Sequence, residues 1–458
     1  MKIFRVLTSL LLTIVAVLCF APSAWAFCGF YVAKADTKLY NKASQVVIAR
    51  NGDRTVLTMA NDFQGEVKDF AIVVPVPTVL QKEQVRVTEP KIIERLDAFS
   101  APRLVEYFDP DPCAPLPLFL RSAVAESAGL SGRSETVQKS DRSLGVTVEA
   151  RFNVGEYDIV ILSAKESGGL ETWLTQNGYK IPQGAKQLLQ PYIRSSMKFF
   201  VAKVNLDKFE QSGYQFLRPL QISYQSPKFI LPIRLGMINA TTEQDLIVYI
   251  LSPQGEAELA NYRTVKIPSN VNIPVFIKNE FGEFYKSMFQ TAYTKEGKRV
   301  GFLEYAWDMG SCDPCSADPL TPEELKEAGV FWLENSPSDT PTFRRFVPSF
   351  FSTNVFISRL HVRYTRDTFP EDLIFLQTAN REQFQGRYVL QYPFEGSVKC
   401  EAGKEYKRSL PNRFEQEAQT LARLTNRNIQ DIRKKMKLSV GDLTYSLWEN
   451  VLSRFGFD

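Results

Sequence analysis

Residues 197–251 read MKFFVAKVNLDKFEQSGYQFLRPLQISYQSPKFILPIRLGMINATTEQDLIVYIL, and this stretch decides the fold class. Short β-branched and aromatic runs alternate with turn residues, which predicts four successive strands: Lys198–Val204, Phe216–Tyr224, Phe229–Met237 and Leu246–Leu251. The gaps between the runs are too short for repeated crossover helices, so antiparallel pairing is favoured over βαβ units. The sequence therefore predicts an α+β fold built mostly on antiparallel sheets with peripheral helices.

The flanking sequence continues the same mixture. Apolar runs predict further strands at 46–48, 55–58, 71–74, 146–152, 157–163, 355–364, 373–377 and 387–391. Helical spacing predicts helices at 90–99, 168–178, 183–194 and 280–293. Asn51-Gly52-Asp53 signals a tight turn, and Pro75 and Pro77 should end the strand before them or confine it to an edge.

The N-terminus has the pattern of a secretory signal peptide. Lys2 and Arg5 precede an apolar run, Val6–Phe20, and Ala24-Trp25-Ala26 fits a small-residue cleavage site, which predicts domain boundaries at residues 1–26 and 27–400. A lipid anchor on Cys28 is the rival interpretation, but Phe27 stands where that modification needs a small residue. We expect an exported protein, soluble after cleavage, in the periplasm or the medium.

Charge separates the body of the chain from its tail. Cleavage would leave 432 residues (458 minus 26) and lower the formal net charge from +4 to +2, which disfavours nucleic-acid binding. Residues 401–458 are predicted to form a basic helical tail, because 404–437 holds ten Lys or Arg against four Asp or Glu. Such a helix could touch anionic lipid or an acidic partner, or pack its apolar stripe on the body. The Ser- and Gly-rich segment 121–144 predicts a mobile loop where two sub-domains could meet.

Five cysteines remain after cleavage of the predicted signal: Cys28, Cys113, Cys312, Cys315 and Cys400. In an oxidising compartment they predict two disulfides and one free thiol, with fifteen possible connectivities. Asp-Pro-Cys occurs at both Cys113 and Cys315, which suggests pairing the two loops. Cys312-Asp-Pro-Cys315 could alternatively be a redox dithiol, although the next helix start lies several residues later and nearby aspartates oppose a thiolate.

Catalytic signatures are scarce. His361 is the single histidine and lies in a predicted strand, where a packing or surface role is the usual one. Ser195-Ser-Met-Lys198 matches Ser-x-x-Lys, but it precedes a strand instead of opening a helix, which indicates a chance match. Walker A, Gly-x-Gly-x-x-Gly and His-Glu-x-x-His motifs do not occur, so we expect no catalytic residue, cofactor or metal.

Several strings together resemble one family of secreted bacterial proteins, the domain of unknown function 2330. They are Cys28–Val32, Met59–Phe63, Asp69–Pro77, Tyr107–Pro110, Thr172–Leu174, Asn177–Tyr179 and Cys312–Cys315. The resemblance runs from Cys28 to about Cys400 and excludes the tail. It implies one secreted, mostly continuous domain unit and brings no known activity, cofactor or catalytic residue.

Two functional hypotheses follow. The first is a non-catalytic module of the cell envelope that binds a protein or glycan, because aromatic residues make up 12% of the chain and no catalytic signature is present. The second is a thiol-disulfide oxidoreductase or redox sensor that uses Cys312 and Cys315. The sequence does not identify the ligand, the disulfide connectivity or the oligomeric state.

Overall fold

The computed structural model describes residues 30–33, 43–60, 70–114, 146–165, 167–177, 185–214, 217–237, 242–311, 313, 316–333 and 354–437. The chain divides into two compact units. The large unit takes its described residues from Met1–Ser100, Gly145–Val265 and Lys298–Gln383, and the small unit takes them from Ala101–Leu144, Lys266–Gly297 and Phe384–Asp458. The predicted signal peptide and the predicted loop at 121–144 lie outside the described residues.

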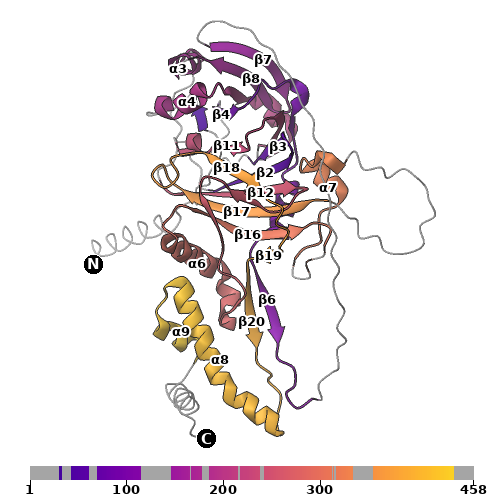
Figure 1. Ribbon diagram of the computed structural model, residues 1–458, viewed down its shortest axis with the longest axis vertical. Helices are drawn as coiled ribbons and strands as arrows, with labels where there is room; N and C mark the ends of the chain where they lie inside the picture. Colours follow the sequence, from indigo (N-terminus) through magenta and orange to yellow (C-terminus); the bar gives the residue numbers. More distant parts are fainter. Residues whose placement is uncertain are drawn as a thin grey trace, which may run out of the picture. The chain divides into compact units, whose positions relative to one another are not determined.

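One sheet of the large unit is antiparallel throughout, with the strand order β1-β4-β9-β8-β7. Its strands are β1 (Phe30–Ala33), β4 (Phe70–Val76), β7 (Val146–Val154), β8 (Tyr157–Ala164) and β9 (Lys198–Val204). Helices α3 (Ser167–Gln176) and α4 (Ala185–Arg194) pack on it through a buried apolar cluster that includes Leu174 and Leu189 (Figure 1). The strand β4 ends at Val76, between the two prolines, as the sequence predicted.

A second sheet of the large unit is mixed and has the order β14-β16-β17-β12-β2-β3-β10-β5. Its strands are β2 (Ala43–Asn51), β3 (Arg54–Met59), β5 (Val85–Val87), β10 (Leu220–Gln225), β12 (Gln244–Ser252), β14 (Arg263–Lys266), β16 (Val300–Asp308) and β17 (Phe356–Tyr364). The neighbours β2 and β12 are parallel. Gly52 turns the β2–β3 hairpin with φ of 57°, a left-handed conformation that glycine adopts without strain.

Two helices cover one face of this mixed sheet. They are α2 (Lys91–Ser100) and α7 (Pro322–Glu327), and both contribute to an apolar core that contains Leu96, Leu325 and Ile357. Thr321 begins α7 with a reciprocal capping box to Glu324. The core is therefore closed on this face by short helices whose ends are satisfied locally.

A third, small sheet consists of β11 (Ile230–Leu231), β18 (Leu373–Gln377) and β13 (Ala257–Leu259). The predicted strand Phe229–Met237 was wrong beyond Leu231, because the chain continues into the 3₁₀ helix η2 (Arg234–Met237). Pro232 offers no N–H to a ladder, and the next two backbone N–H groups donate to the side chain of Asp372, the residue before β18, instead of to a strand. This departure from strand geometry shapes the candidate site described below.

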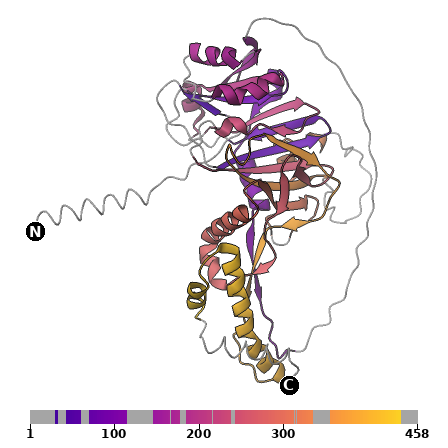
Figure 2. The same cartoon turned by 60° about the vertical axis from the view of Figure 1, so that its left-hand side comes forward.

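The described residues of the small unit form a three-stranded parallel sheet and three α-helices. The strands are β6 (Arg103–Phe108), β20 (Arg387–Tyr392) and β15 (Val271–Asn272), and the helices are α6 (Phe281–Lys295), α8 (Glu401–Thr425) and α9 (Ile429–Lys435). Helix α8 runs beside β6 and β20 in both views (Figures 1 and 2) and packs on α6 and α9. The predicted basic tail is thus helical where it is described, and Ala418 and Leu421 of its apolar stripe are buried.

The remaining described elements are short. They are η1 (Lys82–Gln84), α5 (Leu206–Ser212), η3 (Val275–Glu280), η4 (Phe331–Leu333) and β19 (Phe384–Gln385). The structure confirms the predicted α+β class with mostly antiparallel sheets, peripheral helices and a helical C-terminal region. Within the described residues, no helix combines the length and apolar character needed to cross a bilayer.

Candidate functional site

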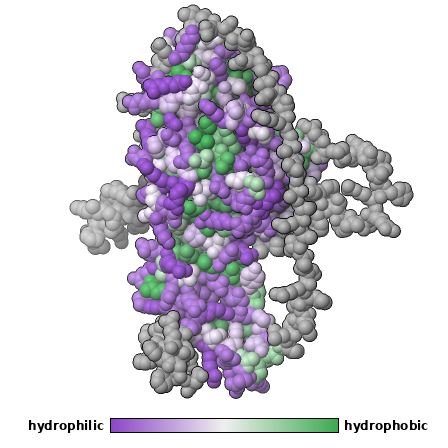
Figure 3. Space-filling view, viewed as in Figure 1, coloured by the Kyte–Doolittle hydropathy of each residue, from purple (hydrophilic) through white to green (hydrophobic). Residues whose placement is uncertain are grey.

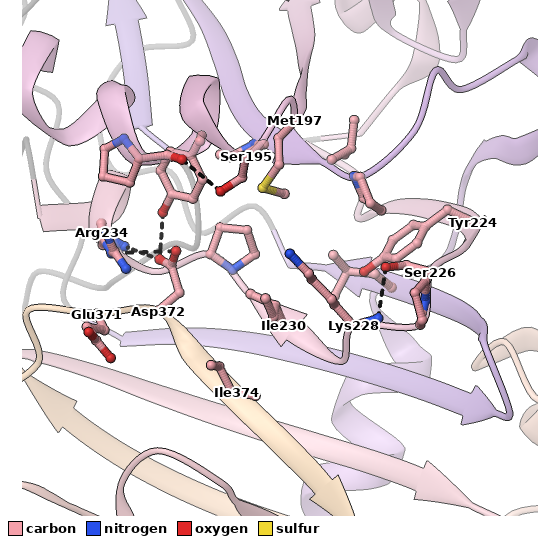
Figure 4. Close-up of a pocket in the computed structure, with 18 residues that line it drawn as sticks. Ser195, Met197, Tyr224, Ser226, Lys228, Ile230, Arg234, Glu371, Asp372 and Ile374 are labelled. Atoms are coloured by element: carbon pink, nitrogen blue, oxygen red, sulfur yellow. Dashed lines mark hydrogen bonds and ion pairs between the residues drawn. The ribbon is translucent and has the colours of Figure 1, made fainter. Parts of the chain in front are cut away.

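A cleft of about 440 Å³ opens in the large unit where the small sheet meets β4, α4 and β10. It is enclosed by residues from five separate stretches of chain, and Figure 4 shows their side chains around one hollow. Its lining combines apolar walls with a few convergent polar groups, which is typical of small-molecule and peptide sites.

Five prolines form much of the cleft wall: Pro75, Pro77, Pro191, Pro227 and Pro232. Each fixes its own φ near −65°, and none supplies an N–H that would need a partner. Pro77, Pro227 and Pro232 follow the ends of β4, β10 and β11, where they cannot extend the ladder. The walls are therefore rigid before any ligand arrives, which lowers the entropic cost of binding.

Asp372 is the polar anchor of the cleft. Its Oδ1 atom accepts hydrogen bonds from Tyr192 Oη at 2.6 Å, from Ile233 N at 2.9 Å and from Arg234 N at 3.2 Å. Its Oδ2 atom faces Arg234 Nε at 3.5 Å, and that buried Nε has no hydrogen-bond partner. Arg234 and Asp372 thus form an ion pair (Figure 4), but the buried Nε–H of Arg234 still lacks a hydrogen bond.

Burial controls protonation at this anchor. Burial raises the pKa of Asp372 above its ordinary value, although the hydroxyl of Tyr192 and the charge of Arg234 act against the rise. Burial also raises the pKa of Tyr192, and the neighbouring carboxylate of Asp372 adds to the effect. Tyr192 therefore stays a hydroxyl donor at neutral pH, and because Oδ1 is fully occupied, the group is suited to holding a ligand in place more than to transferring protons.

Lys228 supplies an unneutralised charge. Its side chain extends across the middle of the cleft (Figure 4), and among the described residues its ammonium group has no ion-pair partner. The backbone N–H of Lys228 donates to Ser226 Oγ at 3.2 Å, which fixes the loop that carries it. An exposed carboxylate, Glu371, lies on the cleft rim.

An apolar shelf, defined as Ile230, Ile374 and Leu376, continues outward from the cleft. The exposed fractions of Ile374 and Leu376 are 37% and 57%, which is unusual for large aliphatic side chains. A second hollow borders this shelf and shares Lys228 and Pro227 with the cleft. Figure 3 shows hydrophobic residues at the surface over β11 and β18, so an apolar ligand could extend beyond the cleft.

The predicted site residues lie elsewhere. Cys113 forms a disulfide with Cys400, with a Cα–Cα distance of 5.8 Å, so the suggested pairing of Cys113 with the Cys312–Cys315 loop was wrong. The reason is topological, because Cys113 follows β6 and Cys400 caps the helix that packs beside it.

Cys28, Cys312 and Cys315 lie outside the described residues, and the redox dithiol stays a prediction. Asp313, between the last two, is buried and accepts a hydrogen bond from Tyr305 Oη at 2.9 Å. Ser195 lines the cleft rim and Lys198 begins β9, so the structure places Ser-x-x-Lys at a helix end as the strand pattern indicated. Among the described residues, no group of three or more His, Cys, Asp and Glu could hold a metal ion.

Sequence reasoning missed a buried row of charges on the mixed sheet. His361 Nδ1 lies 2.7 Å from Glu304 Oε1, and its Nε2 lies 3.1 Å from Asp245 Oδ1. Arg359 Nε donates to Glu304 at 2.7 Å and Arg363 Nε to Asp245 at 2.7 Å, which extends the row at both ends. The signal was present in Arg-Leu-His-Val-Arg, because alternate residues of a strand share one face.

Burial alone would lower the pKa of His361, but the carboxylates of Glu304 and Asp245 outweigh it and raise the pKa. A protonated His361 donates through both ring nitrogens, which satisfies the buried carboxylates on either side. Arg359 Nη1 also pairs with Asp97 Oδ1 at 2.6 Å, so three cations meet three carboxylates and the row is internally neutralised.

A family model described as an uncharacterized protein conserved in bacteria, DUF2330, matches residues 22–376, which is 355 of the 458 residues. The chain belongs to this family, as the sequence resemblance indicated. No curated protein and no solved structure matches the chain.

Proposed function

We propose that the protein is an extracytoplasmic binding module whose proline-walled cleft holds a ligand with an apolar body and one anionic group. The observation that carries the proposal is the unneutralised ammonium of Lys228 in the middle of a rigid cleft of about 440 Å³. Lys228 is exposed within the cleft, so an ionised acid on the ligand can reach its ammonium group and form a charge-assisted hydrogen bond.

The rest of the cleft fits such a ligand. The proline rings and the apolar shelf would cover the ligand's body, while Arg234 Nε offers a donor that lacks a hydrogen bond. Export is part of the proposal. It is supported by the signal-peptide pattern of residues 1–26 and by the Cys113–Cys400 disulfide, since disulfides persist in oxidising compartments.

The test uses three probes that share one apolar body and differ in the head group: 4-phenylbutyrate, 4-phenylbutanol and 4-phenylbutylamine. Isothermal titration of the full chain should give the tightest binding for the carboxylate and the weakest for the amine. The Lys228→Met variant should lose this order, because the methionine keeps the apolar stem and removes the charge. Lys186→Met is the matched control, since Lys186 is an exposed lysine of α4 that does not line the cleft.

Two results would overturn the proposal. One is equal affinity for the three probes in the unmodified protein. The other is an unchanged preference for the carboxylate in Lys228→Met, since the charge would then act from elsewhere. Export is tested separately by N-terminal sequencing of the mature protein, which should begin at Phe27.

A further inference from the structure

A second hollow of the large unit lies at the end of α7 and is lined mainly by charged and polar residues. Its volume is about 430 Å³, and β3, β5 and β10 form its floor. Gly329, which follows α7, also lines the hollow. Its φ is 100°, and a Cβ at this position would lie 2.5 Å from Val56 Cγ1. Only a glycine lets the C-terminal end of α7 approach the sheet this closely.

Three cations line this hollow, and none of them has a carboxylate partner among the described residues. Arg54 is exposed and lies over the ring of Phe331, with 4.2 Å between its Cζ and the ring centroid. Arg86 donates to the side chain of Gln221 and to backbone carbonyls at the end of α7, which are neutral acceptors. Lys326 is exposed and projects from the last turn of α7. This arrangement holds guanidinium groups in place while leaving their charge unneutralised.

The hollow also contains carboxylates. Glu83 and Glu327 line it, so its formal charge is +1 from three cations and two anions. Glu327 accepts a hydrogen bond from Thr88, whereas Glu83 has no partner among the described residues. A ligand of densely packed negative charge would be repelled by Glu83, but a ligand that carries hydroxyl groups beside its acid could donate to it.

A neighbouring hollow of about 470 Å³ shares Arg54, Gln84 and Ser223 with the first. The two together offer more room than one phosphate or one carboxylate would fill. Two guanidinium groups without a carboxylate partner, the carboxylate of Glu83 and the hydroxyl of Ser223 line this path. We propose that the Arg54–Arg86–Lys326 hollow binds an acidic oligosaccharide, with a uronate carboxylate on the arginines and sugar hydroxyls on Glu83 and Ser223.

The test is independent of the proline-walled cleft. Trigalacturonate, its methyl ester and inorganic phosphate are titrated into the full chain labelled with ¹⁵N-arginine, and side-chain Nε–Hε signals are followed by NMR. We expect the signals of Arg54 and Arg86 to shift with trigalacturonate and the ester to bind about tenfold more weakly, since a charge-assisted hydrogen bond contributes about that factor. Inorganic phosphate should not displace the trimer.

Variants locate the site. Arg54→Gln and Lys326→Gln should each weaken trigalacturonate binding several-fold while leaving the backbone amide spectrum unchanged, because both side chains are exposed. Arg151→Gln is the matched control, an exposed arginine of β7 outside the hollow. The proposal is overturned if trigalacturonate does not bind, if the ester binds equally well, if phosphate displaces the trimer, or if Arg151→Gln weakens binding as much as Arg54→Gln.

Discussion

Replacing Glu417 by glutamine should stabilise the small unit at neutral and alkaline pH. Glu417 lies on α8 with a side chain that is 2% exposed, and its Oε1 atom has no hydrogen-bond partner. Arg413 Nε lies 3.7 Å away but already binds Asp109 through Nη1 at 2.6 Å. One guanidinium therefore faces two carboxylates, and the group carries a net charge of −1 whenever Glu417 is ionised.

The magnitude follows from the protonation equilibrium. Burial raises the pKa of Glu417 to about 7 from its ordinary 4.5, with Asp109 adding to the rise and Arg413 opposing it. The unfolded chain releases the proton near pH 4.5 and the folded unit near pH 7, so stability falls as the pH rises between these values. Above pH 7 the full cost is about 3 kcal/mol, at 1.36 kcal/mol for each pKa unit. Glu417→Gln removes this cost and should leave stability at acid pH nearly unchanged.

The matched control is two residues away on the same helix. Burial acts to raise the pKa of Glu415, but hydrogen bonds from Arg433 and Gln419 outweigh it and lower the pKa. Glu415→Gln should therefore destabilise the unit by about 1 kcal/mol at neutral pH, the opposite sign from Glu417→Gln. Amide-exchange mass spectrometry in increasing urea, read from peptides of α8, measures both variants. Two results would contradict this prediction: a loss of stability in Glu417→Gln at alkaline pH, or a gain that does not depend on pH. Either result would show that ionised Glu417 is compensated by a partner that the structure does not show.

Further predictions concern the charged row and the cysteines. The pKa of His361 is raised in the folded protein, so its contribution to stability is complete below the unfolded pKa of 6.5 and disappears as the pH rises through the folded pKa. His361→Gln should therefore lower the free energy of unfolding by roughly 3 kcal/mol under acid conditions and by less under alkaline conditions. Urea unfolding measures both values. Cys113→Ser or Cys400→Ser should each destabilise the small unit by roughly 2–5 kcal/mol, and the double variant should add little to either, as judged by the same exchange experiment. Alkylation before and after graded reduction should show Cys312 and Cys315 resisting mild reductant, as structural staples do; opening at mildly reducing potential would favour the dithiol hypothesis instead.

The local sequence pattern was sufficient to predict most of the strands and helices. The strand Lys198–Val204 has the predicted bounds, and the helix predicted at 280–293 corresponds to α6. These elements are long and strongly apolar, so their local preference agrees with their place in the core. The prediction failed at Phe229–Met237, where a side chain more than 130 residues away, Asp372, takes the backbone donors that a strand would need. Sequence periodicity carries no information about such a distant acceptor.

The candidate cleft was not predictable for the same reason. The sequence pattern places Lys228 between two predicted strands, Pro232 inside the predicted strand Phe229–Met237 and Tyr192 on a helix face. They form a candidate site because separate elements bring them to the lining of one cleft, and the sheet order determines that convergence. The clustering of prolines at strand ends was the available signal, because prolines that stop several ladders at one edge leave backbone there uncovered.

The charged row and the proline-walled cleft show how a structural cluster differs from a site that awaits a ligand. Around His361, both ring nitrogens face carboxylates and each carboxylate also meets an arginine, so protonation of the ring satisfies the group without outside help. In the cleft, by contrast, Arg234 Nε is buried without a hydrogen-bond partner and Lys228 has no counter-ion among the described residues. A buried donor without a hydrogen bond costs about 1–3 kcal/mol of stability, and an acceptor on a bound ligand would remove this cost. This imbalance, more than the size of the hollow, is the reason why we propose the cleft, and not the charged row, as a binding site.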